Sequence, residues 1–142
     1  MQRDRERGQA VVWLAAMLPC FLAVLGLAID GDVVWNAERS LQDLADGAAR
    51  TGAEALDTQA YYASDGRTVA LDPSAARQQT ERYLLQEGSG ATWSVSADAQ
   101  EVIVRLRQSV PTSFVRIVGI NAVPLTATAV AEVRHGVASG TP

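Results

Sequence analysis

The hydrophobic pattern of the chain is dominated by an uninterrupted apolar run near its start. Residues 9–29 contain no charged side chain. As an α-helix that rises about 1.5 Å per residue, this run spans about 32 Å, which matches a bilayer hydrocarbon core of about 30 Å. A buried helix of a soluble protein is the alternative, but such helices are seldom uncharged for so long. The run therefore predicts a transmembrane helix, kinked at Pro19 because proline removes a backbone donor.

The polar stretch that follows should continue the same helix, because no turn-forming cluster separates the two. From Asp30 to Leu56, apolar and small residues recur every three or four positions, which places them in one stripe on a helix. Small side chains let another backbone approach closely, so we expect this stripe to lie flat on a sheet or a partner helix. The predicted packing face consists of Leu41, Ala45, Ala48 and Gly52.

The next part of the chain predicts a loop and a second helix. Residues 57–72 contain the turn signal Asp65-Gly66 and are expected to form a loop. Asp72-Pro73 is typical of a helix start, with aspartate as the cap and proline in the first turn. We expect this helix to continue to about Glu87 and to end at Gly88.

Two short alternating segments predict a β-hairpin. Residues 92–97 place Trp93, Val95 and Ala97 on one side of a strand. Residues 101–110 alternate in the same way, and only a tight connection separates the two segments. We therefore expect them to pair antiparallel.

The last part predicts a short helix and a long strand. The helix should begin at Pro111 and end at Gly119. Its apolar side chains are expected to point inward, namely Phe114, Ile117 and Val118. Residues 123–133 alternate again, with alanine prominent on the inner face, and predict a strand that fits the alanine-rich helix stripe.

These elements predict an α+β fold in which the long N-terminal helix packs on a small three-stranded antiparallel sheet. The expected division of the chain is a basic leader over residues 1–8 and a transmembrane helix over 9–29. A folded domain over residues 30–135 and a flexible tail over 136–142 complete it.

Charges on the two sides of the apolar run predict its orientation. Three arginines precede it, which favours a cytoplasmic N-terminus and an extracytoplasmic domain in a single-pass protein of the cell membrane. Asp30 and Asp32 follow it, and we expect both to be hydrated carboxylates at the membrane edge, because the further ligands of a calcium loop are missing. The alternative is a cleaved secretory signal that would release a small binding module after Ala28.

Composition and charge argue against catalysis and nucleic-acid binding. The net charge of −4 offers no basic face for nucleic acid. Cys20 is the one cysteine and lies in the apolar run, where a thiol is expected to be inert. The one histidine, His135, has no evident catalytic partner. We therefore expect no enzymatic activity, no cofactor, no metal and no small-molecule substrate.

Two segments resemble the TadE/TadG-like family of tight-adherence (Flp) pilus-assembly proteins. In the first, Leu41-Gln42, Ala45-Asp46 and Ala48-Ala49 follow the family's LQ-x-x-AD-x-AA pattern after the apolar run. The second, VPTSFVRIVGINAVPLTATAVAEV, is similar to the family's ending, a Pro-Thr-x-Phe helix and an alanine-alternating strand. The resemblance covers about half of the chain. It implies a pilin-like fold in a minor pilin-like subunit or assembly factor of a Flp-type pilus or related secretion system. The implied partners are the lipid bilayer and other pilus-assembly or pilin-like proteins.

The resemblance also bears on processing of the N-terminus. Some family members are cut by a prepilin peptidase after a glycine before the apolar run, which here implies a cut between Gly8 and Gln9. Pilin-like substrates usually carry a glutamate five residues after the cut, where this chain has Trp13. A carboxylate there would neutralise the new α-amino group of a neighbouring subunit, and tryptophan cannot. We therefore expect the protein to keep residues 1–8.

Overall fold

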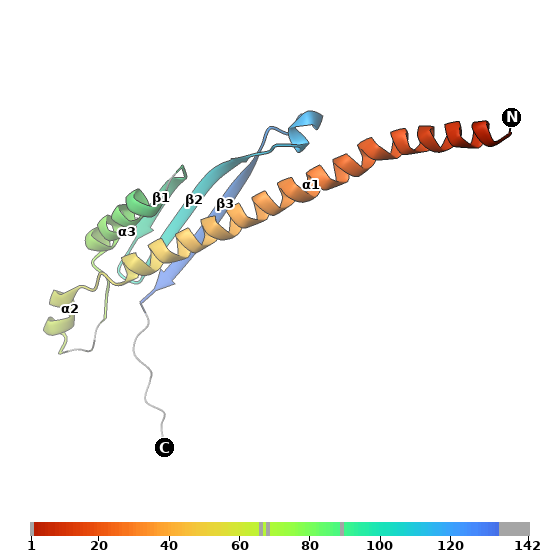
Figure 1. The fold of residues 1–142 in the computed structure, drawn as a ribbon. Helices are drawn as coiled ribbons and strands as arrows, with labels where there is room; N and C mark the ends of the chain where they lie inside the picture. The colour runs from red at the N-terminus through yellow and green to blue at the C-terminus, as the bar shows by residue number, and fades with distance from the viewer. Residues whose placement is uncertain (1, 66, 68, 89, 134–142) are drawn as a thin grey trace, which may run out of the picture. The chain divides into compact units, whose positions relative to one another are not determined.

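The computed structural model describes residues 2–65, 67, 69–88 and 90–133, without the side chains of residues 2–10 and 118. Its first element, α1, is one helix from Gln2 to Ala53 (Figure 1). The prediction of a single helix that passes from the apolar run into the polar stretch is confirmed. The helix is rich in alanine and leucine, which favour helix, and Pro19 lies inside it.

A short helix, α2, occupies Thr58–Ala63, where we predicted only loop. The carboxylate of Asp57 caps it, because Oδ1 accepts the backbone N–H of Ala60 at 3.0 Å. The prediction was wrong here because a helix of six residues shows too little hydrophobic periodicity to be recognised. The segment that contains α2 is closed at its base by an isolated antiparallel bridge between Leu56 and Leu71.

The helix α3 spans Pro73–Glu87, as its flanking residues predicted. Asp72 Oδ1 accepts the N–H groups of Ser74 at 2.9 Å and of Ala75 at 3.1 Å, which satisfies two donors of the first turn. At the other end, the N–H of Gly88 donates to the carbonyl of Leu84 at 2.8 Å.

The three strands form one antiparallel sheet in the order β1-β2-β3, which confirms the predicted fold class (Figure 1). They are β1 (Thr92–Ala97), β2 (Glu101–Pro111) and β3 (Ala122–Glu132). In the hairpin of β1 and β2, Thr92 is opposite Arg107 and Ala97 is opposite Val102. Asp98 holds the tight turn, because its Oδ1 accepts the N–H groups of Gln100 and Glu101 at 2.8 and 2.9 Å.

The connection from β2 to β3 differs from the prediction. Pro111 ends β2 instead of opening a helix, and a single 3-10 turn, η1, spans Val115–Val118. Gly119 ends this turn with a φ of 96°, as expected. The inward orientation was wrong for Phe114 and Ile117, which are 46% and 83% exposed. One turn of helix is too short to bury apolar side chains on all of its sides. The third residue of the prediction, Val118, has its side chain outside the described residues.

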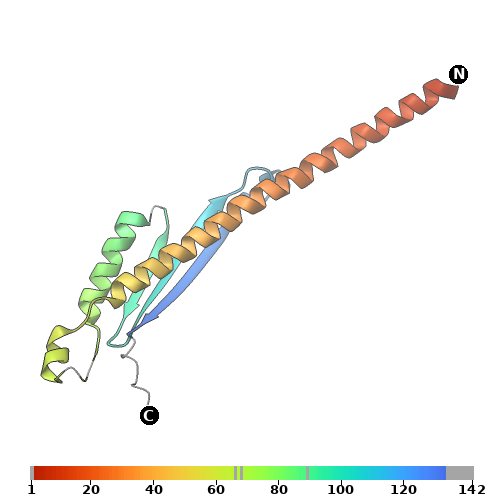
Figure 2. The same cartoon turned by 60° about the horizontal axis from the view of Figure 1, so that its bottom comes forward.

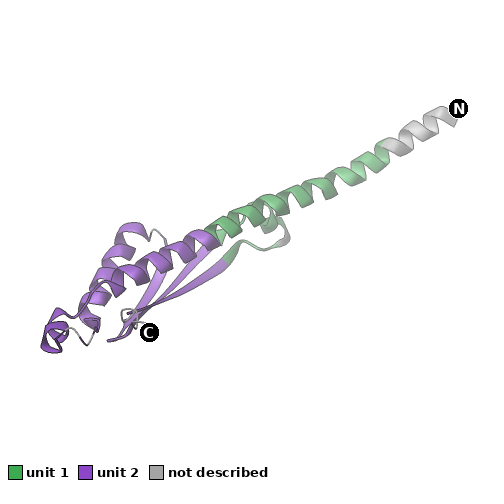
Figure 3. Cartoon of the chain, turned by 90° about the horizontal axis from the view of Figure 1, so that it is seen from below, with its two compact units in different colours: residues 1–37, 110–123 green, residues 38–109, 124–142 purple. Residues whose placement is uncertain are grey.

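The chain divides into two compact units (Figure 3). One contains residues 1–37 and 110–123, and the other contains residues 38–109 and 124–142. The core of the second unit lies between one face of the sheet and two helices, α3 and the second half of α1 (Figure 2). Its buried sheet residues alternate along the strands, which confirms the predicted period of two: Val102, Val104, Leu106, Leu125, Ala127 and Ala129.

The two helices of this unit meet where their side chains are small. Gly52 of α1 lies so close to α3 that a Cβ atom there would overlap the hydroxyl of Thr80, and it would lie 3.1 Å from Val102 Cγ1 of β2. Ala76, Thr80 and Leu84 form the buried side of α3. Close approach of two helices to one sheet therefore depends on the absence of a side chain at Gly52.

Candidate functional site

The apolar part of α1 is the first candidate site, because its large side chains are exposed. Between residues 11 and 29 only Gly26 is buried, and large side chains such as Trp13, Leu14 and Phe21 are each more than 60% exposed. Within the part of the chain that the structure describes, α1 is the one helix long and apolar enough to cross a membrane. A soluble core helix would have its side chains covered, and these are not. The helix therefore fits a single-pass membrane anchor.

Asp30 lies at the end of this apolar surface, and its carboxylate binds the start of the β2–β3 connection. Oδ1 accepts the N–H of Ser113 at 3.0 Å, and Oδ2 accepts the N–H groups of Phe114 at 2.8 Å and Val115 at 2.7 Å. The residue is only 5% exposed. Our expectation of a hydrated carboxylate was wrong for Asp30, whereas its neighbour Asp32 is exposed.

These contacts keep the Asp30 carboxylate charged. The backbone N–H of Val115 contributes most to lowering the pKa of Asp30, with further lowering by Ser113 and Phe114, while burial raises it. Since η1 has no capping side chain in its own segment, a carboxylate distant in sequence takes that place. We call Asp30 with residues 113–115 the Asp30 clasp.

Two further contacts shape the β2–β3 connection. Thr112 closes its base, because its N–H donates to the carbonyl of Asn121 at 3.1 Å and its hydroxyl donates to the carbonyl of Ile120. Phe114 packs against Gly26, where an added Cβ would lie 2.8 Å from the Cβ atom of Phe114. Next to this contact lies an open apolar groove of about 740 Å³, whose lining includes Pro19, Leu22, Gly26, Ile29, Phe114 and Ile117.

The predicted packing face of α1 lies in the interior of the second unit. Leu41, Ala45 and Ala48 are at most 3% exposed, and Gly52 contacts α3 as described above. At the edge of this face, Gln42 Nε2 donates to the carbonyl of Thr128 in β3 at 3.3 Å and to Asp46 Oδ1 at 3.1 Å. The LQ-x-x-AD-x-AA pattern therefore supplies both the small residues Ala45 and Ala48 and a hydrogen bond from Gln42 to β3.

The remaining residues considered from sequence are not brought together. Gly8 and Gln9 lie within α1, but their side chains are outside the described residues, and so is all of His135. Cys20 is exposed on the apolar surface. Among the described residues no group of acidic, histidine or cysteine side chains could hold a metal ion.

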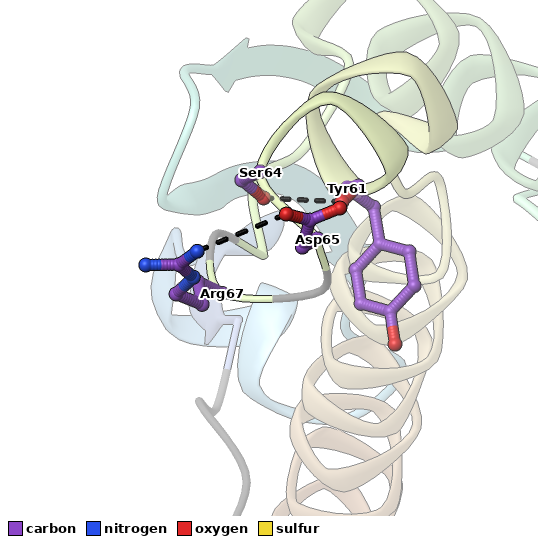
Figure 4. Close-up of polar contacts among 4 residues, drawn as sticks. All are labelled: Tyr61, Ser64, Asp65 and Arg67. Atoms are coloured by element: carbon purple, nitrogen blue, oxygen red, sulfur yellow. Dashed lines mark hydrogen bonds and ion pairs between the residues drawn. The ribbon is translucent and has the colours of Figure 1, made fainter.

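The polar contacts around α2 do not form a site either (Figure 4). Ser64 Oγ donates to the carbonyl of Tyr61 at 3.1 Å, which ends the helix. The ion pair between Arg67 and Asp65 is 3.8 Å long, and both side chains are more than 80% exposed. An exposed pair of this kind contributes little to stability or binding.

Two protein-family models match this chain. A family model described as Flp pilus-assembly TadE/G-like matches residues 8–55. A second model, described as Tad-like Flp pilus-assembly, matches residues 35–131, more than half of the chain. The chain belongs to the Tad-like Flp pilus-assembly family. The two matches of this Tad-like protein overlap on the second half of α1, which carries the packing face. No curated protein and no solved structure matches it.

Sequence reasoning missed the Asp30 clasp in this Tad-like protein. The available signal was weak, because Asp30 precedes its partners by 83 residues or more. The one local hint was a short Pro-Thr-Ser-Phe turn, which has no capping side chain of its own.

Proposed function

We propose that this Tad-like protein is a membrane-anchored, pilin-like assembly subunit of a Flp-type pilus or related secretion system. The main observation in support is that α1 has an exposed apolar part and a part that is buried against the sheet. Residues 11–29 expose apolar side chains, whereas Leu41, Ala45 and Ala48 are buried on the protein's own sheet. A helix built in this way joins a bilayer or a neighbouring apolar helix to a folded domain. We call the domain expected over residues 30–135 the head.

The function follows from contacts and not from catalysis. The anchor holds the head at the membrane surface, with the N-terminus in the cytoplasm and the head outside, an orientation supported by the three arginines that precede the apolar run. Other pilus-assembly or pilin-like proteins are the partners. Trp13 stands where pilin-like substrates usually carry a glutamate, which favours an anchored assembly factor over a filament subunit.

Deletion of the gene in the native bacterium tests the role. We expect loss of surface pili in electron micrographs and recovery when the full chain is supplied from a plasmid. A tagged copy should remain with the inner membrane, while sheared filaments lack it. Normal pili in the deletion strain would contradict the assembly role, and tagged protein in the filaments would instead make it a filament subunit.

Carbonate extraction separates this proposal from release after Ala28. The anchored protein should stay in the membrane pellet at its full mass, and protease added to spheroplasts should digest the head but not residues 1–8. A soluble product that begins at Ile29 would establish the secreted binding module instead. The contact of Gly26 with Phe114 favours retention, because cleavage after Ala28 would remove it.

A further inference from the structure

The β2–β3 connection exposes a set of apolar side chains beside the anchor. Phe114, Ile117 and Ile120 are 46%, 83% and 49% exposed. Their segment is a loop closed at its base, since the N–H of Thr112 donates to the carbonyl of Asn121 and its hydroxyl donates to the carbonyl of Ile120. Exposed apolar side chains clustered on one short loop indicate a surface that is covered in its working environment.

The position of this loop along α1 gives its depth. Phe114 contacts Gly26, which lies three residues before Ile29, the end of the uncharged run. Three residues of helix correspond to about 4.5 Å along the axis. The side chain of Phe114 therefore lies beside the last turn of the apolar run, while the backbone of residues 113–115 binds Asp30 at its end.

We propose that the β2–β3 connection enters the outer edge of the bilayer, where acyl chains cover Phe114, Ile117 and Ile120. The loop is then a second membrane contact beside α1. The apolar surface of the anchor continues onto the loop, because Pro19, Leu22 and Ile29 of the anchor line the same groove as Phe114 and Ile117. If these anchor residues face acyl chains, the loop residues that line the groove with them do so as well.

The polar groups of the loop suit this environment. Backbone N–H and carbonyl groups in hydrocarbon need internal partners, and here Asp30 accepts three N–H groups at the entry to η1. Within the turn, Ile117 N–H donates to Phe114 O at 3.1 Å and Gly119 N–H donates to Arg116 O at 3.0 Å. Arg116 is exposed, and its long side chain can reach the lipid phosphates from this depth.

The loop thereby gives the unit that contains it and the apolar run two contacts with the membrane instead of one. A single helix can tilt and rotate in the bilayer, and its packing neighbours and interfacial anchors set its position. A second inserted segment, held to α1 by Asp30, restrains this freedom. This inference rests on α1 being a membrane anchor and is independent of the role in pilus assembly.

Depth-dependent fluorescence quenching tests the proposal on the full chain. In a Cys20→Ala background, Ile117→Cys carries an environment-sensitive fluorophore. The purified protein is reconstituted in phosphatidylcholine and phosphatidylglycerol vesicles at low protein-to-lipid ratio. Matched controls are Leu25→Cys in the anchor and Leu85→Cys on α3, which are 47% and 73% exposed. The quenchers are lipids with nitroxide near the headgroup and aqueous iodide.

We expect the label at residue 117 to lose most of its emission to the nitroxide lipids and little to iodide, as the label at residue 25 does. Quenching by iodide to the extent seen at residue 85 would overturn the proposal. Protection from both quenchers would overturn it too, because protein and not lipid would then cover the loop. Failure of lipid quenching at residue 25 would refute the anchor itself, and the proposal with it.

Discussion

The carboxylate of Asp30 lies 2.7 Å from the backbone nitrogen of Val115, a residue 85 positions further along the chain. This bond, with those to Ser113 and Phe114, ties the end of the apolar run to the β2–β3 connection. Hydrogen bonds to an ionised acceptor are stronger than neutral ones. The apolar part of α1 and the loop beside it are therefore joined by one charged side chain.

Asp30→Asn should release this loop. Asparagine keeps the shape of the side chain, but it removes the charge and replaces one accepting oxygen with an NH₂ donor that cannot accept an N–H. We expect faster amide hydrogen exchange at Ser113, Phe114 and Val115 in detergent micelles. Asp32→Asn is the matched control, because Asp32 is exposed and close by in sequence. Equal exchange rates in the two variants would contradict the clasp.

Acid should weaken the folded state through three aspartates. The N–H groups of the η1 entry hold the pKa of Asp30 below its ordinary value. The hydroxyl of Ser74, followed by the N–H groups of Ala75 and Ser74, does so for the pKa of Asp72. The N–H groups of Gln100 and Glu101 do so for the pKa of Asp98. A lowered folded-state pKa stabilises the fold above the unfolded value of 3.8 and loses this effect as the pH falls below it.

Thermal unfolding followed by circular dichroism checks this dependence. We expect Tm to be level near neutral pH and to fall once the pH drops below 3.8. The double variant Asp72→Asn, Asp98→Asn should begin at a lower Tm and show a shallower fall, because it lacks two of the three carboxyl groups whose pKa the fold lowers. An equal slope in the variant and the parent protein would show that these caps do not carry the pH dependence.

Local signals allowed most of the fold to be predicted. The cap at Asp72 and the glycine at position 88 bounded α3 because helix ends depend on neighbouring residues. Alternation gave the strands, because one face of each strand packs on the same core. The Asp30 clasp could not be predicted in this way, since its partners lie in a different element.

The error at Phe114 and Ile117 has a second cause besides the shortness of η1. Apolar character predicts burial only if the surroundings are water, and here both residues line one groove with the apolar part of α1, which fits a membrane anchor. Sequence patterns do not distinguish a side chain directed at a protein core from one directed at lipid. The apolar run and the helix stripe could therefore be described from the sequence, but the contact of Asp30 with the β2–β3 connection could not.

Gly52→Ala should destabilise the second unit. A Cβ atom there would overlap the Thr80 hydroxyl, and that hydroxyl is held by its bond to the carbonyl of Ala76 at 2.9 Å. Overpacking of this kind costs about 1–3 kcal/mol. Urea unfolding in micelles should show the loss, and adding Thr80→Ala should restore part of it.

Gly31→Ala is the matched control for this change. A Cβ atom at Gly31 meets nothing within 4 Å, and alanine is favoured over glycine inside a helix by about 1 kcal/mol. The two Gly→Ala changes in α1 should therefore act in opposite directions. A loss of stability at both positions would refute steric overlap as the cause at Gly52.

Leu106→Ala should cost far more than Leu85→Ala. Leu106 is fully buried on β2, whereas Leu85 is 73% exposed on α3. A buried leucine replaced by alanine leaves a cavity and costs about 2–5 kcal/mol, while a surface change usually stays within about 0.5 kcal/mol. Since small domains have only about 5–15 kcal/mol of stability in total, the lower Tm of Leu106→Ala should be plain in a thermal melt. Similar melting of both variants would mean that β2 does not line the core.

The mature protein should keep residues 1–8. A cut between Gly8 and Gln9 would place a new α-amino group at the start of the apolar run. An unpaired charge within a membrane is costly, and no carboxylate occurs between residues 9 and 29 to pair with it. Trp13, at the position where a pilin-like substrate would supply glutamate, is apolar and 63% exposed. Intact mass spectrometry of the protein purified from membranes should therefore give the mass of a chain that includes residues 1–8. A product that starts at Gln9 would contradict this and would favour entry into the filament.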